Sequence, residues 1–333
     1  MKTVTMADVA KKAKVSKSTV SQYINNRYEY MSAETKTRIE EAIEELGYHP
    51  NVIARSLKQK KTSTIGVIVA NILHAFSTQV IRAVEDVSND SNVSVIICNA
   101  DDNPEKEQKY IEMLRAKQVD GLILFPIGSN FELYQQLKEE NVPLVFVDRR
   151  VEGIETASIL LENENASEIA VDHFFKRGYT RIGILTTSIA EKITPRVERI
   201  EGYKKALVKR GLPLRDDYIA SVDISDMQDA LTNMFSQPEP PQALLAGSDL
   251  AFLEVLHFVK RKGMQIPDDL AVISMDEVSF SEIYQPRLTT ISQPAYQMGK
   301  HATEILLKQI KTGKEVNSDL IRYPASLIIR EST

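Results

Sequence analysis

Cysteine is almost absent from this chain. Cys98 is the only cysteine among the 333 residues, so no disulfide can form within the chain. It lies in the apolar run VSVIICN, where a thiol is expected to be a buried structural side chain rather than a reactive one. We therefore assign Cys98 to the hydrophobic core and expect no redox role for it.

Long apolar runs and targeting segments are also missing. No stretch approaches the ~18 consecutive apolar residues that a membrane-spanning helix needs, and no signal peptide opens the chain. We therefore expect a cytoplasmic protein that has no membrane partner.

The motifs of nucleotide-dependent and hydrolytic enzymes are missing as well. The sequence has no G-x-x-x-x-G-K-[ST] loop, no G-x-G-x-x-G turn and no G-x-S-x-G elbow. Its five histidines fall in no spacing that is typical of metal ligands: His49, His74, His173, His257 and His301. The sequence therefore predicts a protein that is not an enzyme and that needs no metal or cofactor.

Charge is unevenly distributed along the chain. The formal net charge is −5, yet residues 1–61 hold 12 lysines and arginines against 7 aspartates and glutamates. The rest of the chain holds 29 basic against 39 acidic residues. A cationic head on an acidic body fits a polyanionic partner for the head alone.

Residues 5–26 predict two short helices joined by a tight turn. Thr5 can cap the first helix, and Asp8 completes a T-x-x-D capping box with it. Ser16 can cap a second helix that runs to about Asn25. This arrangement is typical of a helix-turn-helix, in which side chains of the second helix reach base edges or phosphates. The predicted DNA contacts of this unit are Thr5, Ser16, Lys17, Ser18, Thr19, Ser21, Gln22 and Asn25.

A third helix is predicted from Ser32 to Leu46, where apolar residues form one stripe along the helix. Gly47 can end it as a C-cap. An ordinary helical hairpin at a domain edge would also explain residues 5–26, but three helices can close a small core of their own. We therefore predict an all-α, three-helix DNA-binding head.

This head resembles that of the lactose/galactose repressor (LacI/GalR) family. The shared pattern is V-T-M-A-D-V-A-x-x-A-x-V-S-x-S-T-V-S, then S-x-E-T, then E-A-I-E-E-L-G-Y-x-P-N-x-x-A-R-S-L, which fills almost all of residues 3–57. The resemblance implies that residues 51–58 form a hinge helix that is ordered on DNA. It also implies that a leucine enters a central minor-groove step, since apolar wedges unstack and bend the duplex. The DNA contacts implied for this helix are Asn51, Ala54, Arg55 and Leu57.

Two residues depart from the family pattern. The family usually has glycine in the turn where this chain has Lys14, so we expect a left-handed backbone at Lys14 with some cost in energy. The family often has arginine where this chain has Gln22. Because arginine favours guanine and glutamine favours adenine, the operator is expected to differ from the common family operator.

From Thr64 onward, short apolar runs alternate with amphipathic helices. The first half offers STIGVIVA, SVIICNA, GLILF and PLVFVD as strands, and the second offers RIGILTT, YIASV, ALLAG and LAVISM. Continuous apolar strands separated by helices predict βαβ units with a parallel sheet that is buried on both faces. Two successive doubly wound units predict two α/β lobes with a ligand cleft between them.

The resemblance continues through this region in the patterns I-G-V-I-V, V-D-G-L-I, P-L-V-F-V-D-R, R-x-x-G-Y and P-x-L-T-T-I-x-Q-P. It implies a two-lobed core like that of periplasmic binding proteins. We expect the chain to cross back between the lobes late. The predicted boundaries are residues 1–49 for the helix-turn-helix domain, 50–63 for the hinge helix and linker, and 64–333 for the core, with residues 64–160 and 291–318 in the first lobe and 161–290 and 319–333 in the second.

Polar side chains at strand ends predict the ligand site, because these ends face the cleft of a two-lobed binder. The candidates in the first lobe are Asn71, His74, Phe76, Ser77, Phe125, Asp148 and Arg149. In the second lobe they are Arg196 and Asp276, and Gln293 follows the T-T-I run near the crossover between the lobes. The resemblance adds Arg199, which matches the effector-binding arginine of the family, and Ser248 or Asp249, where the family commonly has an aspartate.

Several of these candidates also have a structural interpretation. Asp148 and Asp276 could cap strands or helices, and His74 could be purely structural. Phe76 and Phe125 could belong to the hydrophobic core. The sequence alone leaves these alternatives open.

Three arginines favour an acidic ligand. Arg196 and Arg199 lie one turn apart near the start of a predicted helix, and Arg149 ends a strand of the facing lobe. A carboxylate is matched by guanidinium groups and by a helix N-terminus, whereas a neutral sugar seldom needs more than one arginine. Arg196 could instead pair with Glu198 or Glu191. The stretches SQYINNRYEYMS and TPRVERIEGYKKAL are also similar to family members that respond to keto-deoxy sugar acids from pectin breakdown, so we expect a sugar-acid effector such as 2-keto-3-deoxygluconate.

The sequence is interpreted as a sequence-specific, effector-controlled transcription regulator, a repressor of sugar-catabolic genes. A two-fold homodimer would present two heads to a pseudo-palindromic operator, which places the protein at the nucleoid in the cytoplasm. One alternative is a global carbon regulator with a protein corepressor. The other is a sugar-binding protein without a regulatory role, but that class predicts a signal peptide where this chain has a basic helical head.

The identity of residue 22 gives a first prediction. Gln22→Arg should shift the base preference towards guanine at one position of each half-site, by about 1–3 kcal/mol, because arginine binds guanine and glutamine binds adenine. Selection of bound duplexes from a random library will measure the preference of each protein. If both proteins select the same half-site, residue 22 does not read a base.

Overall fold

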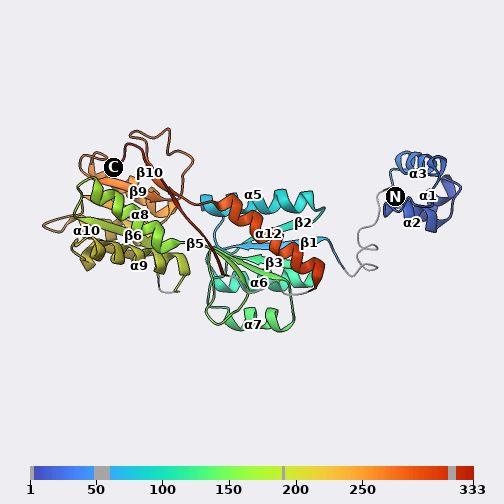
Figure 1. The fold of residues 1–333 in the computed structure, drawn as a ribbon, viewed down its shortest axis with the longest axis horizontal. Helices are drawn as coiled ribbons and strands as arrows, with labels where there is room; N and C mark the ends of the chain where they lie inside the picture. Colours follow the sequence, from blue (N-terminus) through green and yellow to red (C-terminus); the bar gives the residue numbers. More distant parts are fainter. Residues whose placement is uncertain (1–3, 49–60, 190–191, 314–319) are drawn as a thin grey trace. The chain divides into compact units, whose positions relative to one another are not determined.

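The computed structural model describes residues 4–48, 61–189, 192–313 and 320–333. The chain divides into two compact units, Met1–Thr62 and Ser63–Thr333, which we call the head and the core (Figure 1). The predicted hinge helix lies outside the described residues, with its expected DNA contacts Asn51, Ala54, Arg55 and Leu57. None of the helices in the described ranges is both long and apolar enough to cross a membrane.

The described residues of the head form three helices, α1 (Met6–Lys12), α2 (Lys17–Ile24) and α3 (Ala33–Leu46). Their apolar faces meet in one small core around Val9, Val20 and Ile39, all fully buried. The three-helix head expected from the sequence is therefore confirmed.

The ends of these helices follow the expected caps. The carboxylate of Asp8 accepts a hydrogen bond from the Thr5 backbone N–H at 2.9 Å, and the Ser16 hydroxyl oxygen accepts one from the Thr19 N–H at 3.1 Å. Gly47 ends α3 with a left-handed φ of 57°. Lys14 carries a φ of 53° in the turn between α1 and α2, as expected at a position where glycine would avoid a steric cost.

The first lobe of the core is a six-stranded sheet covered by helices on both faces. The strand order is β11-β5-β4-β3-β1-β2, and every pairing in this sheet is parallel. Helices α5 and α12 cover one face, and α6 and α7 cover the other. The elements are β1 (Thr64–Val69), α5 (Ala75–Asp90), β2 (Ser94–Asn99), α6 (Pro104–Ala116), β3 (Gly121–Leu124), α7 (Phe131–Glu139), β4 (Leu144–Val147), β5 (Ala157–Leu161), α12 (Ala295–Thr312) and β11 (Leu320–Tyr323).

The second lobe repeats this plan, with strand order β12-β10-β9-β8-β6-β7. Its pairings are parallel except for the antiparallel pair β10 and β12. Helices α8 and α9 cover one face, and α10 and α11 cover the other. The elements are α8 (Asn163–Lys176), β6 (Ile182–Thr187), α9 (Thr194–Lys209), β7 (Ile219–Val222), α10 (Met227–Phe235), β8 (Ala243–Ala246), α11 (Asp249–Lys262), β9 (Ala271–Met275), β10 (Thr289–Ser292) and β12 (Ser326–Ile328).

Central strands such as β3, β4, β8 and β9 are buried along their whole length. This is why they read as continuous apolar runs rather than as alternating ones, since helices exclude water from both faces of the sheet. The doubly wound α/β core expected from the sequence is confirmed.

The described chain passes between the lobes at three places: after β5, after β10 and after β11. The prediction placed residues 319–333 in the second lobe, but Leu320–Tyr323 pairs with β5 in the first sheet. The predicted boundary also assigned residue 291 to the first lobe, whereas β10 pairs with β9 in the second sheet up to Ile291. The short strand LIRY lies at a sheet edge and is only partly buried, so its apolar pattern is too weak to assign it to a lobe.

Helices α8 and α9 approach each other closely at Gly202, which gives a prediction about stability. A Cβ added at Gly202 would lie 2.3 Å from the carbonyl oxygen of Glu164. Gly202→Ala should therefore lower the free energy of unfolding by about 2 kcal/mol, because backbone atoms cannot move aside as a flexible side chain would.

Urea denaturation of the purified protein will measure this loss. Val208→Ala is the control, because Val208 lies on the same helix with 67% of its surface exposed, and alanine is well tolerated in helices. Equal stability of the two variants would show that α8 and α9 separate without cost.

Candidate functional site

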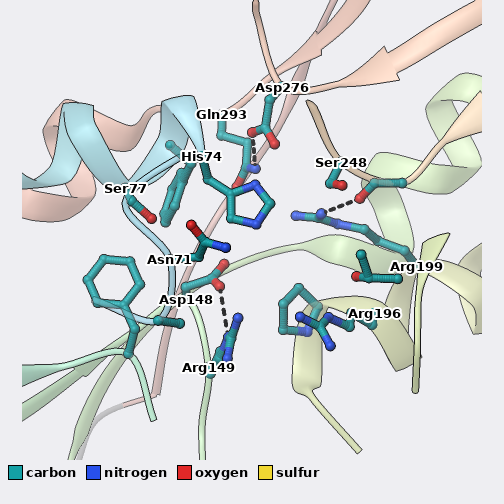
Figure 2. Close-up of a pocket in the computed structure, with 16 residues that line it drawn as sticks. Asn71, His74, Ser77, Asp148, Arg149, Arg196, Arg199, Ser248, Asp276 and Gln293 are labelled. Carbon is teal, nitrogen blue, oxygen red and sulfur yellow. Dashed lines mark hydrogen bonds and ion pairs between the residues drawn. The ribbon is translucent and has the colours of Figure 1, made fainter. Parts of the chain in front are cut away.

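A pocket lies between the two lobes, where the carboxyl ends of their strands face each other (Figure 2). The pocket and the solvent-filled space at its opening together have a volume of about 500 Å³. All the predicted ligand residues except Asp249 line it: Asn71, His74, Phe76, Ser77, Phe125, Asp148, Arg149, Arg196, Arg199, Ser248, Asp276 and Gln293. In the described part of the chain, no group of three histidine, cysteine, aspartate or glutamate side chains is placed to hold a metal ion.

Four further residues line the pocket that the sequence did not single out: Ala70, Thr187, Pro195 and Gly247. Ala70 directly follows β1, Thr187 ends β6 and Gly247 directly follows β8. The strand-end rule that identified the other candidates would have found these three as well. Pro195 lies in the first turn of α9, next to the predicted Arg196.

Asp148 and Asp276 occupy the same place in the two lobes. Each follows a central strand, β4 or β9, and has a left-handed backbone, with φ of 67° and 78° respectively. The backbone N–H of Asp148 donates to Ile159, and that of Asp276 donates to Ile291, both at 2.9 Å. This conformation is uncommon for a residue other than glycine, and Figure 2 shows both carboxylates directed into the pocket.

Asp276 has a strongly perturbed acidity. It is only 6% exposed, and this burial raises its pKa to about 6, although the positive charge of Arg199 acts in the opposite direction. The negative charge of Asp249 adds to the increase. The Gln293 side-chain amide donates a hydrogen bond to the carboxylate, so the amide is held at the wall of the pocket.

Arg149 is buried at the pocket wall with part of its hydrogen-bonding capacity unused. It is 5% exposed, and its Nη2 lies 2.8 Å from Oδ1 of Asp102. Its Nε lies 3.5 Å from a carboxylate oxygen of Asp148. Nε and Nη1 have no hydrogen-bond partner.

Arg196 comes from the second lobe and pairs with the same aspartate. Its Nη2 lies 3.4 Å from Oδ2 of Asp102, and its Nη1 donates to the Ser188 carbonyl at 3.0 Å. The sequence left pairing with Glu198 or Glu191 open, but Glu198 pairs with Arg322, and Glu191 lies outside the described residues.

Asp102 was missed by the sequence reasoning, although it follows β2 and the strand-end rule could have indicated it. Burial acts to raise its pKa, but Arg149 and Arg196 outweigh this effect and hold the pKa below its usual value. Asp102 is therefore an ionised carboxylate that contacts one arginine from each lobe.

Arg199 is fixed in place by two acceptors. Its Nε donates to the Asn163 side-chain oxygen at 2.9 Å, and its Nη1 donates to the Gly247 carbonyl at 2.7 Å. The residue is 6% exposed, and Figure 2 shows its guanidinium pointing into the pocket towards His74.

Asp249 joins the two lobes instead of lining the pocket. It was predicted as a ligand residue, but its Oδ1 lies 2.5 Å from Nδ1 of His74, and its Oδ2 accepts a bond from the Ala75 N–H at 2.7 Å. Burial alone would lower the pKa of His74, yet the hydrogen bond and charge of Asp249 raise it. His74 therefore contacts the opposite lobe through Asp249 and also forms part of the pocket wall.

Phe76 and Phe125 form the apolar wall of the pocket. Their rings pack edge to face with centroids 6.1 Å apart, and both belong to the core of the first lobe. The core interpretation and the pocket interpretation therefore both describe these residues.

In the head, helix α2 presents an exposed polar surface. Lys17, Ser18 and Gln22 are exposed on it, while Thr19, Ser21 and Asn25 are half-buried. Thr5 and Ser16 contribute to caps, and the Asn25 side chain donates to the Ser21 carbonyl at 2.6 Å. Among the predicted contacts, Lys17, Ser18 and Gln22 are thus the side chains that remain most available to a partner.

The chain matches two family models. A model described as "Bacterial regulatory proteins, lacI family" matches residues 5–51, and one described as "Periplasmic binding proteins and sugar binding domain of LacI family" matches residues 62–331.

Relatives match over nearly the whole chain. A probable HTH-type transcriptional regulator, EndR of Paenibacillus polymyxa, is 44% identical over 332 residues, which is 98% of each chain. The HTH-type transcriptional regulator KdgR of Bacillus subtilis is 33% identical and covers 98% of this chain and 97% of its own. A crystal structure of the Lac repressor bound to ONPG in the repressed state superimposes with a TM-score of 0.87, at 25% identity and full coverage of both chains.

The raised pKa of Asp276 gives a prediction about pH. Because the folded-state pKa of about 6 exceeds the ordinary value of 3.8, folding takes up a proton between these values, and stability falls as pH rises through that window. Asp276→Asn removes this titration. Relative to the wild type, the variant should gain about 1 kcal/mol in free energy of unfolding between pH 5 and pH 7.

Urea denaturation at the two pH values will measure the gain. Asp229→Asn, at an exposed position on α10, is the control. Its free energy of unfolding should differ from that of the wild type by the same amount at pH 5 and at pH 7. A constant difference for Asp276→Asn as well would mean that Asp276 is already ionised at pH 5 in the folded protein.

Proposed function

The chain belongs to the LacI family of bacterial regulatory proteins, and on this premise we propose that it is a repressor of sugar-catabolic genes whose operator affinity is controlled by a sugar acid. Membership of this family makes the chain a DNA-binding transcriptional regulator rather than an enzyme. The observation that carries the ligand class is Arg149, a buried guanidinium at the pocket wall with Nε and Nη1 unpartnered.

Unpartnered donors at a buried guanidinium favour an anionic ligand. A buried donor without an acceptor costs roughly 1–3 kcal/mol, so a ligand that supplies acceptors to both nitrogen atoms gains binding energy. Nε and Nη1 lie on different edges of the guanidinium, so a carboxylate can bind one of them with a charge-assisted hydrogen bond while a hydroxyl of the same ligand binds the other. A single sugar hydroxyl is a weaker match.

The rest of the pocket fits the polyhydroxy part of such a ligand. Asp148 and Asp276 offer carboxylate acceptors from the two lobes, while Asn71 and Gln293 offer amides. Phe76 and Phe125 supply an apolar wall beside these groups. A six-carbon keto-deoxy acid such as 2-keto-3-deoxygluconate carries both a carboxylate and several hydroxyls.

A neutral sugar is the alternative ligand. Asp102 already contacts Arg149 and Arg196. Asp276 lies close enough to Arg199 for the positive charge of Arg199 to act on the pKa of Asp276. If these aspartates neutralise all three guanidinium groups, the pocket has no charge left for an acid. Nε and Nη1 of Arg149 form no hydrogen bond, although Nε lies 3.5 Å from a carboxylate oxygen of Asp148, and these free donors favour the acid over the neutral sugar.

We also propose that two copies of the chain form the DNA-binding unit. Large apolar side chains are exposed on both lobes, among them Leu73 (71%) and Ile97 (42%) on the first and Ile283 (79%) on the second. Ile97 lies on the edge strand β2, where a second copy could cover it. A two-fold dimer would bind a pseudo-palindromic operator, which places the protein at the nucleoid.

The ligand class can be tested on operator DNA obtained by selection. Fluorescence anisotropy will give operator affinity in the presence of sugar acids, including 2-keto-3-deoxygluconate, gluconate and galacturonate, and of neutral sugars such as glucose, galactose and cellobiose. We expect one sugar acid to change operator affinity at least about tenfold, a coupling typical of allosteric proteins. Calorimetry will give the affinity of each compound for the protein itself.

Arg149→Lys is the decisive variant, because lysine keeps the positive charge but lacks the guanidinium donors Nε and Nη1. It should weaken binding of the acid at least about tenfold while leaving operator affinity without ligand unchanged. Arg82→Lys, at a 70% exposed arginine side chain, is the matched control. Tight binding of a neutral sugar by the wild type, with no sugar acid bound, would overturn the proposed ligand class.

A further inference from the structure

A series of hydrogen bonds links Arg199 to a strand of the opposite lobe. Asn163 accepts a bond from Arg199 Nε at 2.9 Å and donates from Nδ2 to Oε2 of Glu198 at 3.1 Å. Glu198 in turn accepts two bonds from the guanidinium of Arg322, at 2.6 and 2.9 Å. We call Asn163, Glu198 and Arg322 the relay. Asn163, at its centre, is fully buried.

The relay has a fixed polarity. An asparagine side chain has one end that donates and one end that accepts. Ionised Glu198 can only accept and Arg199 can only donate, so a single orientation of the Asn163 amide satisfies both neighbours. Glu198 and the Leu161 carbonyl, which accepts from Asn163 Nδ2 at 3.3 Å, therefore both favour the orientation in which the Asn163 oxygen faces Arg199, although Glu198 itself does not line the pocket.

The relay also spans the boundary between the lobes. Arg322 lies on β11 in the first sheet, whereas Glu198 and Arg199 lie on α9 in the second lobe. Asn163 begins α8 directly after the chain leaves β5. Arg322 Nη1 additionally donates to the Leu161 carbonyl at 2.9 Å, beside this crossing. A rotation of one lobe against the other would therefore change the geometry between Arg322 and Glu198.

We propose that Asn163, Glu198 and Arg322 are positioning residues of the ligand site, which orient Arg199 and couple its orientation to the hinge between the lobes. The consequence for ligand binding rests on the proposed function, in which Arg199 contacts the effector. The orientation of Arg199 itself can be measured without any ligand. A simpler view holds that Glu198 and Arg322 only clamp the lobes together.

Exchanging the two charged residues separates these views. In Glu198→Arg/Arg322→Glu the ion pair is kept, so a simple clamp would still work. However, residue 198 would then present only donors to Asn163. We expect the amide to turn its oxygen towards the new donors at residue 198, and the Arg199 Nε–H then loses its acceptor.

The readout is the ¹⁵Nε–¹Hε NMR signal of Arg199 in the full-length protein, identified by its absence from Arg199→Lys. We expect the exchanged pair to melt close to the wild type but to increase solvent exchange of this proton at least about tenfold, since one buried hydrogen bond is lost. The control exchanges Glu164 and Lys205, an exposed ion pair between α8, which begins with Asn163, and α9, which carries Arg199. It should leave the Arg199 signal unchanged.

Asn163→Ser provides a second test if the exchanged pair melts well below the wild type. It keeps the pairing of Glu198 with Arg322 but removes the amide that accepts from Arg199 and donates to Glu198, so it should accelerate the same exchange. An unchanged Arg199 signal in a folded variant would leave only the clamp and would overturn the positioning role.

Measurements of ligand binding distinguish the positioning role of the relay from the proposed sugar-acid ligand class, on which its effect on ligand binding rests. If the wild type binds 2-keto-3-deoxygluconate or another acid of the panel, the exchanged pair should bind that acid at least about tenfold more weakly while keeping its operator affinity. If the wild type binds no acid, the proposed ligand class fails, and the NMR result alone then decides the positioning role. Unweakened binding of an acid by the exchanged pair would contradict the coupling.

Discussion

The carboxylate of Asp249 holds the walls of the pocket together. It extends from the first residue of α11 in the second lobe and accepts hydrogen bonds from His74 and from the Ala75 N–H of the first lobe. Ala75 is the first residue of α5, a 16-residue helix, so this carboxylate also lies at the positive end of a helix dipole. Together with the pair Arg196 and Asp102, this contact joins the strand ends of the two lobes at the pocket.

The pocket itself is built from charges that would be costly to bury singly. Asp102 lies between an arginine of each lobe, and Asp276 is buried near Arg199 and Asp249. Burying an unpaired charge is unfavourable, so the closed arrangement depends on these pairs. A ligand that offers its own acceptors competes with the aspartates for the arginines. Such competition shifts the balance between lobe arrangements only if the ligand binds one of them more tightly.

Much of this could be predicted from local sequence chemistry. The helix caps at Ser16 and Gly47 depend on neighbours in the chain, and the central strands are apolar because both sheet faces are covered. The strand-end rule is sufficient to bring Asn71, Asp148 and Asp276 into one predicted site, since parallel strands all end at one edge of a sheet.

The rest depends on partners distant in the sequence. Asp249 contacts His74, which is 175 residues away, and no local pattern indicates that pairing. Strand β11 is short and partly exposed, so only its pairing with β5 reveals its lobe. Asp102 follows its strand by three positions in a turn, and its role becomes visible only when Arg196 approaches from the second lobe.

We propose that the arrangement of the lobes carries the signal from ligand to operator. The most direct test is the distance between spin labels at residues 109 and 229, one on each lobe of a protomer, measured by pulsed electron resonance during a titration with the effector. We expect the distance distribution to shift during the titration. The effector concentration at which half of this shift has occurred should equal the concentration at which half of the change in operator affinity has occurred. A change in operator affinity with an unaltered distance distribution would contradict it.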